Sequence, residues 1–126
     1  MQMLTPPPGN GGAIFSTGTV TADSSTFTRC SASGTGVDNG YGGAITSVDV
    51  ITVTGSTITG CSAVHGGAVA ASSGGTLRFN RLVDNDVGSA VHASGAVLDA
   101  TDNWWGTNAN PSGHTYGPVT TSPWLV

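Results

Sequence analysis

Two short segments of the chain alternate polar and apolar side chains. Thr26-Phe27-Thr28 and Thr57-Ile58-Thr59 each hold one large apolar residue between two threonines. Successive side chains of a β-strand point to opposite faces, so each segment is predicted to be a strand whose central residue faces inward. The threonines would then face outward.

This pattern belongs to an internal repeat. Four Gly/Ala-rich tetrapeptides mark its origins, at 11–14, 42–45, 66–69 and 88–91. Three later offsets also agree in residue character. Sixteen residues after each first glycine stand Phe27, Ile58, Leu82 and Trp104. Nineteen residues after it stand Cys30, Cys61, Asn85 and Thr107, and fourteen residues after it stand Ser25, Ser56, Asn80 and Asp102.

A repeat of this length, with Gly-rich turns and short Val/Ile/Thr strands, is typical of a parallel β-helix. The predicted fold is all-β, a right-handed parallel β-helix of about four coils, at 11–41, 42–65, 66–87 and 88–109. Neighbouring coils would pair at about 4.8 Å, and stacking would form the core because no coil buries its apolar face alone. A leucine-rich repeat has a similar period, but its regular leucines and helix formers are missing.

The repeat predicts the residues that form the core. Phe27, Ile58, Leu82 and Trp104 are expected to form one internal column. Two further ladders follow the glycines, one of alanines and one of branched residues. The sequence does not decide which of them faces inward, although the bulkier ladder is the better candidate. These ladders consist of Ala13, Ala44, Ala68 and Ala90, and of Ile14, Ile45, Val69 and Val91.

Composition narrows the functional classes. The 126 residues include 20 glycines, 37% hydrophobic residues and only 8% charged residues, with a net charge of −4. The chain has no basic patch, which argues against a nucleic-acid partner. No apolar run approaches the roughly 20 residues that span a bilayer as a helix.

The motifs resemble those of known families. Gly-Gly-Ala-Ile followed by an apolar-x-x-Asn/Cys motif resembles the repeat of the polymorphic outer-membrane proteins, over residues 11–87. That resemblance implies a secreted, surface-exposed domain with a role in adhesion. The segments at 102–106 and 122–125 are similar to the closing segment of many right-handed β-helix proteins of the pectate-lyase-like superfamily.

The two ends of the β-helix are expected to differ. Residues 103–126 are predicted to be a C-terminal cap, overlapping the last coil, in which Trp105 and Trp124 cover the open end. Residues 1–10 are expected to be a disordered or extended lead-in. Because it offers little apolar cover, the N-terminal end is expected to meet missing upstream coils or to self-associate.

The cysteines offer a first candidate feature. Cys30 and Cys61 occupy the same offset in neighbouring coils, so their Cα atoms should lie about 4.8 Å apart, within the disulfide range. A disulfide and a ladder of two free thiols both remain open, and the stacked geometry favours the thiols.

A second candidate is a recognition loop in the long first coil. Asp38, Asn39 and Tyr41 could contact a sugar or a protein, although a solvated Gly-rich bulge explains the same residues. The paired threonines could instead form an ice-binding array, but Arg81 and Val83 replace them in the next coil.

No catalytic or metal site is predicted. Asp84, Asp86, Asp99 and Asp102 are the carboxylates that could serve polysaccharide cleavage, but aspartates at turns more often bond the backbone. His65, His92 and His114 lack the spacing of metal ligands, and the first two are expected to be solvated at turns. No cofactor is expected.

The sequence thus favours a non-catalytic structural or adhesin-like β-helix segment of a secreted or cell-surface bacterial protein, associated with the outer membrane. Its expected partners are a surface glycan or a host or cell-surface protein. The alternative is a carbohydrate-binding or polysaccharide-acting β-helix fragment.

Overall fold

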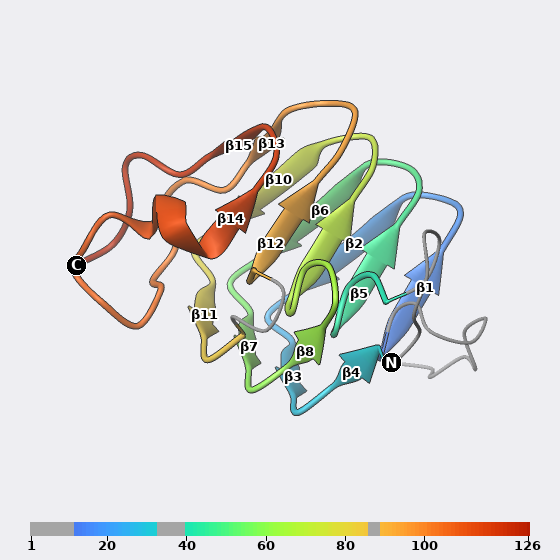
Figure 1. Ribbon diagram of the computed structural model, residues 1–126, viewed down its shortest axis with the longest axis horizontal. Coiled ribbons are helices and arrows are strands. Elements are labelled where there is room, and N and C mark those ends of the chain that lie inside the picture. The colour runs from blue at the N-terminus through green and yellow to red at the C-terminus, as the bar shows by residue number, and fades with distance from the viewer. Residues whose placement is uncertain (1–11, 33–39, 86–88) are drawn as a thin grey trace.

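The computed structural model describes residues 12–32, 40–85 and 89–126, and these residues are almost entirely short strands and turns (Figure 1). The only helical element among them is the 3-10 turn η1 (Pro111–His114), so no helix there is long and apolar enough to cross a membrane. The strands are β1 (Ile14–Ser16), β2 (Val20–Asp23), β3 (Thr26–Thr28), β4 (Ser31–Ala32), β5 (Ile45–Ser47), β6 (Ile51–Thr54), β7 (Thr57–Thr59), β8 (Ser62–Ala63), β9 (Val69–Ala71), β10 (Gly75–Arg78), β11 (Arg81–Val83), β12 (Val91–Ala93), β13 (Leu98–Asp99), β14 (Thr115–Tyr116) and β15 (Val119–Thr120).

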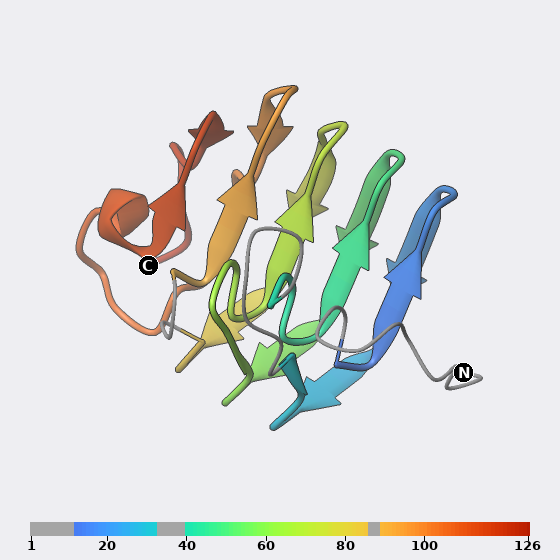
Figure 2. The same cartoon turned by 45° about the vertical axis from the view of Figure 1, so that its right-hand side comes forward.

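The strands stack in four parallel sheets. The orders are β1-β5-β9-β12-β14, β2-β6-β10-β13-β15, β3-β7-β11 and β4-β8. Each sheet takes its strands from successive repeats of the chain, and equivalent strands lie side by side along the long axis (Figure 2). This all-β arrangement of stacked parallel strands is consistent with a parallel β-solenoid.

The core forms where alternating side chains stack in register. Phe27, Ile58 and Leu82 are partners across β3, β7 and β11, and all three are buried. The threonines on either side of Phe27 and Ile58 point away from the core, as strand geometry requires. A second column joins Val53 to Leu77 across β6 and β10.

The alanine and branched ladders both lie in the core. Ala44, Ala68 and Ala90 are buried, and so are the adjacent Ile45 and Val69. Strict alternation fails here because the backbone turns a corner. The N–H groups of Ala44 and Ile45 both donate to the carbonyl oxygen of Ala68, each at 3.0 Å. Two successive residues can therefore face the interior.

Glycine is required at this corner for close packing of the backbone. A Cβ on Gly43 would lie 2.0 Å from the carbonyl oxygen of Gly67 in the next repeat, and one on Gly67 would lie 1.9 Å from that of Asn85. Gly42 has a positive φ of 67°, which favours glycine on separate grounds. The Gly-Gly pairs therefore let successive repeats touch at this corner.

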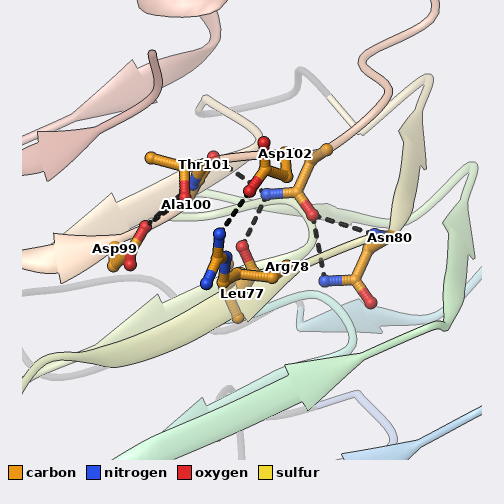
Figure 3. Close-up of polar contacts among 8 residues, drawn as sticks. Leu77, Arg78, Asn80, Asp99, Ala100, Thr101 and Asp102 are labelled. Atoms are coloured by element: carbon orange, nitrogen blue, oxygen red, sulfur yellow. Dashed lines mark hydrogen bonds and ion pairs between the residues drawn. The ribbon is translucent and has the colours of Figure 1, made fainter. Parts of the chain in front are cut away.

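A polar ladder lines another corner. The side-chain oxygen of Ser56 accepts a hydrogen bond from the Ser25 N–H at 3.0 Å. Asn80 Oδ1 accepts one from the Ser56 N–H at 2.9 Å, and Asn103 Oδ1 accepts one from the Asn80 N–H at 2.9 Å (Figure 3). The Asn80 amide also donates to the Val53 carbonyl oxygen at 2.9 Å. These side chains satisfy backbone groups that the bend leaves without strand partners.

The last repeat is shifted by one residue relative to the sequence prediction. Asn103, rather than Asp102, occupies the polar ladder. Trp104 forms a β-bridge with Arg81 and is half-buried, so Trp105 instead reaches the buried position after Leu82. The prediction that Trp104 continues the internal column is therefore wrong.

An extra residue in a turn explains this shift. Three residues separate Ala71 from Gly75, whereas four separate their partners Ala93 and Leu98. An offset counted from the glycines of the repeat therefore falls one residue short after this turn.

The C-terminal residues continue the sheets as well as covering the core. β14 pairs with β12 and β15 pairs with β13, so each of the two longest sheets gains a further strand. Trp124 packs against the buried core cluster, and its indole N–H donates to the Asn108 carbonyl oxygen at 3.1 Å. The predicted cap is thus built partly from paired strands.

The polar ladder predicts the effect of Asn80→Ala. The substitution leaves the buried Ser56 N–H and the Val53 carbonyl oxygen without their partner, so the free energy of unfolding should fall by about 3 kcal/mol. Urea unfolding measures this change. Ser25→Ala, at the partly exposed start of the same ladder, is the control and should lose less than about 1 kcal/mol. Equal losses would show that the ladder does not stabilise the bend as described.

The shifted register predicts different effects for the two neighbouring tryptophans. Trp105→Ala removes a side chain that is 4% exposed and should lower the free energy of unfolding by about 3–5 kcal/mol. Trp104→Ala removes a half-buried ring and should lower it by at most about 2 kcal/mol. Thermal or urea unfolding of both variants gives the comparison, and a larger loss for Trp104→Ala would support the unshifted register instead.

Candidate functional site: an aromatic and imidazole groove

One sheet presents a row of unlike side chains on its outer face. The second residues of β1, β5, β9, β12 and β14 are partners in register: Phe15, Thr46, Ala70, His92 and Tyr116. Their neighbours along each strand, such as Val69 and Ala71, belong to the core cluster, so alternation turns the second residues outward. The row therefore runs across the strands, along the stack.

Ala70 has the smallest side chain in this row, so the surface is recessed there, and we call this recess the step. The Ala70 methyl group stands between Thr46 on one side and the ring of His92 on the other. A cavity of about 330 Å³ opens at this position, and Phe15, Tyr41 and His92 contribute rings to its wall. The outer face is thus a groove with a small residue at its floor.

Four rings gather at one end of the groove. Tyr41 stacks on His65 with ring centroids 4.5 Å apart, and His92 stacks on Tyr116 at 4.7 Å. The two pairs meet each other: the centroids of His65 and His92 are 5.2 Å apart, and the Tyr41 ring meets His92 edge-on at 5.5 Å. We name these four residues the ring cluster.

The ring cluster borders a second hollow that continues the first. This hollow measures about 540 Å³ and is lined by Val64 and Ser89 as well as by the four rings. Tyr41, His92 and Ser94 line both hollows, so the groove is continuous across the cluster.

The described residues that line the groove include no aspartate, glutamate, lysine or arginine. The chain as a whole has no lysine or glutamate. Burial, and then the charge of His65, lower the pKa of His92 below its usual 6.5. His92 is therefore neutral at pH 7. Hydroxyl groups of threonine, serine and tyrosine provide the remaining polar atoms.

Repeat geometry also brings the rings together from distant parts of the chain. Tyr41 and His65 each precede a glycine that begins a repeat, and they form a β-bridge with each other. His92 and Tyr116 occupy the same position in β12 and β14. The shared offset of Tyr41 and His65, each one residue before a repeat glycine, is the sequence signal that predicts this contact.

The histidine prediction is wrong for His92. This residue lies within β12, is only 8% exposed and faces the groove, whereas solvation at a turn was expected. His114 lies in η1, where its ring stacks with that of Trp105 at 6.3 Å.

The predicted recognition loop is represented in the groove by one residue. Tyr41 belongs to the ring cluster, while Asp38 and Asn39 lie outside the described residues.

The two cysteines are free thiols. They lie at a further corner of the chain, where side chains accept hydrogen bonds from the backbone of the preceding repeat. Cys61 Sγ accepts a hydrogen bond from the Cys30 N–H at 3.3 Å, and Asn85 Oδ1 accepts one from the Cys61 N–H at 2.9 Å. The sulfur thus takes the place that an asparagine oxygen takes in the next repeat. Burial raises the pKa of Cys61 to about 11, so its thiol is protonated at neutral pH.

Two of the candidate catalytic carboxylates, Asp99 and Asp102, are engaged by neighbouring side chains. Asp102 forms an ion pair with Arg78, and Asp99 accepts hydrogen bonds from the hydroxyl and N–H groups of Thr101 at 2.7 and 3.0 Å (Figure 3). Hydrogen bonding from Thr101 lowers the pKa of Asp99. Asp84 occupies a turn with a positive φ of 60°, and Asp86 lies outside the described residues.

No group of three or more histidine, cysteine or acidic side chains that could hold a metal ion occurs within 12–32, 40–85 and 89–126. Comparison of the chain with protein-family models, curated proteins and solved structures gave no match. The functional proposal therefore rests on the geometry of the groove.

The cysteine ladder predicts unequal reactivity. The thiolate is the reactive form, and the raised pKa of Cys61 keeps its thiol protonated, so iodoacetamide at pH 8 should modify Cys30 well before Cys61. Peptide mass spectrometry after brief labelling measures this order. Full labelling of both cysteines is expected in denaturant without a reductant. A requirement for reductant would show that the pair is bridged.

Proposed function

We propose that this protein is a non-catalytic, adhesin-like recognition segment that binds carbohydrate in the groove over Ala70. In this proposal the stacked sheets belong to a right-handed parallel β-helix of about four coils from a secreted or cell-surface protein. The observation that carries the proposal is the ring cluster beside a small-residue step on a rigid sheet.

The chemistry of the groove suits a sugar. A sugar ring has an apolar face of C–H groups and an edge of hydroxyl groups. Flat rings such as those of Tyr41 and Tyr116 offer apolar area together with a polar tip, and the groove adds serine and threonine hydroxyls. Binding sites for small molecules commonly combine a mainly apolar wall with a few polar groups in this way.

The paired strands of the sheet hold the groove residues in place before a ligand binds. Phe15, Thr46, Ala70 and His92 are fixed to adjacent paired strands, so little side-chain or loop ordering is needed when a ligand enters. Preorganisation of this kind raises affinity because less entropy is lost on association. A glycan lying along the stack would contact several repeats at once.

The adhesin-like role is supported by sequence resemblance. The Gly-Gly-Ala-Ile and apolar-x-x-Asn/Cys motifs resemble those of the polymorphic outer-membrane proteins, which are surface-exposed and implicated in adhesion. The second candidate function, cleavage of a polysaccharide, would need carboxylates such as Asp84, Asp99 and Asp102, which do not line the groove. Release of reducing or unsaturated sugar ends separates cleavage from binding alone.

A glycan array followed by isothermal titration with the best ligand tests the proposal. Tyr116→Ala removes an exposed ring of the cluster, and Ala70→Leu fills the step, so each should weaken binding at least about tenfold, which corresponds to about 1.4 kcal/mol. Circular dichroism should show that both variants keep their strands.

Phe79→Ala is the matched control, because Phe79 is 60% exposed and Tyr116 is 62% exposed, but Phe79 lies outside the groove. This variant should bind as the unaltered protein does. No glycan binding, or equal weakening by Phe79→Ala and Tyr116→Ala, would contradict the proposal. Release of sugar ends by the unaltered protein would favour the enzyme.

A further inference from the structure

His92 is the most enclosed residue of the ring cluster. It lies between Ala70 of β9 and Tyr116 of β14, and it is 8% exposed. Rings of three residues approach it: Tyr116 stacks on it, Tyr41 meets it edge-on, and His65 lies tilted with its centroid 5.2 Å away. Both imidazoles face the hollow beside Tyr116.

The charge of the cluster depends on these two imidazoles. β9 presents Ala70 to His92, β14 presents Tyr116, and the segments before Gly42 and Gly66 present Tyr41 and His65. The remaining residues of the second hollow, Val64, Ser89 and Ser94, carry no charge. Among these residues the imidazoles are the groups whose charge acidification changes.

Protonation would disturb the cluster in two ways. Two imidazolium ions about 5 Å apart repel each other, and the burial of His92 reduces the screening of this repulsion by water. A charged imidazole also retains its water, so it no longer offers an apolar face to a ligand. The same two causes, burial and the charge of His65, hold the pKa of His92 below 6.5.

We propose that the groove binds an uncharged glycan while His65 and His92 are neutral, and releases it when acidification protonates them. This inference rests on the proposed carbohydrate-binding function and adds its regulation. The neutral imidazole pair is a structural part of the binding surface, and the protonated pair is not.

The sign and size of the effect follow from linkage. A glycan that binds only the neutral cluster lowers the pKa of His92 further. Affinity then falls on acidification by about tenfold for each unit by which binding lowers that pKa. Because the pKa of free His92 is already below 6.5, the loss should be confined to more acidic solutions.

The experiment combines two measurements on the full chain. Nuclear magnetic resonance follows the imidazole signals of His65, His92 and His114 between pH 8 and pH 4.5, with and without the neutral oligosaccharide that binds best on the array. Isothermal titration gives the affinity for the same oligosaccharide at pH 7.5 and at one pH unit below the pKa that the resonance titration gives for free His92.

The expected result is that His92 titrates below pH 6.5, that the oligosaccharide lowers its pKa further, and that affinity falls about tenfold when the pH is lowered to one unit below the pKa of free His92. His92→Gln should remove most of this pH dependence. His114→Gln, outside the groove, should retain it, and so should Asp38→Asn and Asp86→Asn, whose positions lie outside the described residues.

Several results would overturn the inference. They are a titration of His92 at or above pH 6.5, no change of its pKa with ligand, equal affinity at both pH values, or loss of pH dependence in an aspartate variant. Equal affinity at both pH values would leave the proposed function standing. Absence of binding at pH 7.5 would defeat the proposed function as well.

Discussion

The fold depends on the in-register stacking of parallel strands from successive repeats. Backbone pairing holds neighbouring strands at about 4.8 Å, so each residue lies directly over its equivalent in the next repeat. Phe27, Ile58 and Leu82 form a column for this reason, and their burial stabilises the stack that aligned them. The same stacking stabilises the corners, because the side-chain oxygens of Ser56, Asn80 and Asn103 accept hydrogen bonds from backbone N–H groups of the preceding repeat.

The candidate site uses this constraint on the outer face. Each of five strands turns the side chain of its second residue outward, and stacking brings these five side chains into one row. Substituting a large residue for Ala70 would remove the hollow, and moving His92 by one residue would turn its ring into the core. The groove therefore needs no loop to shape its floor. Variation of one residue in each repeat can change the surface while the core stays the same.

Much of the fold could be predicted from the sequence because the repeat is short and its apolar positions are regular. The strands at Thr26–Thr28 and Thr57–Thr59 follow from alternation, and their partnership follows from equal offsets. The register of the last repeat could not be predicted, because one extra residue in the turn before β13 moves Asn103 and Trp105 into the positions expected for Asp102 and Trp104. The residue types of this turn do not mark the insertion. Alternation also failed at the Gly-Ala corner, where a bend buries two successive residues.

The site was harder to predict than the fold. The sequence predicts Tyr41 as a candidate recognition residue, but its contact with His65 depends on the register between two repeats. His92 was predicted to be solvated at a turn, whereas it lies in the three-residue strand β12. The most direct test of the account is a nuclear Overhauser spectrum of the aromatic region. The account predicts cross-peaks between the rings of His92 and Tyr116 and between those of Tyr41 and His65. Their absence, in a spectrum that still shows contacts between Phe27 and Ile58, would contradict the stacked register that builds the groove.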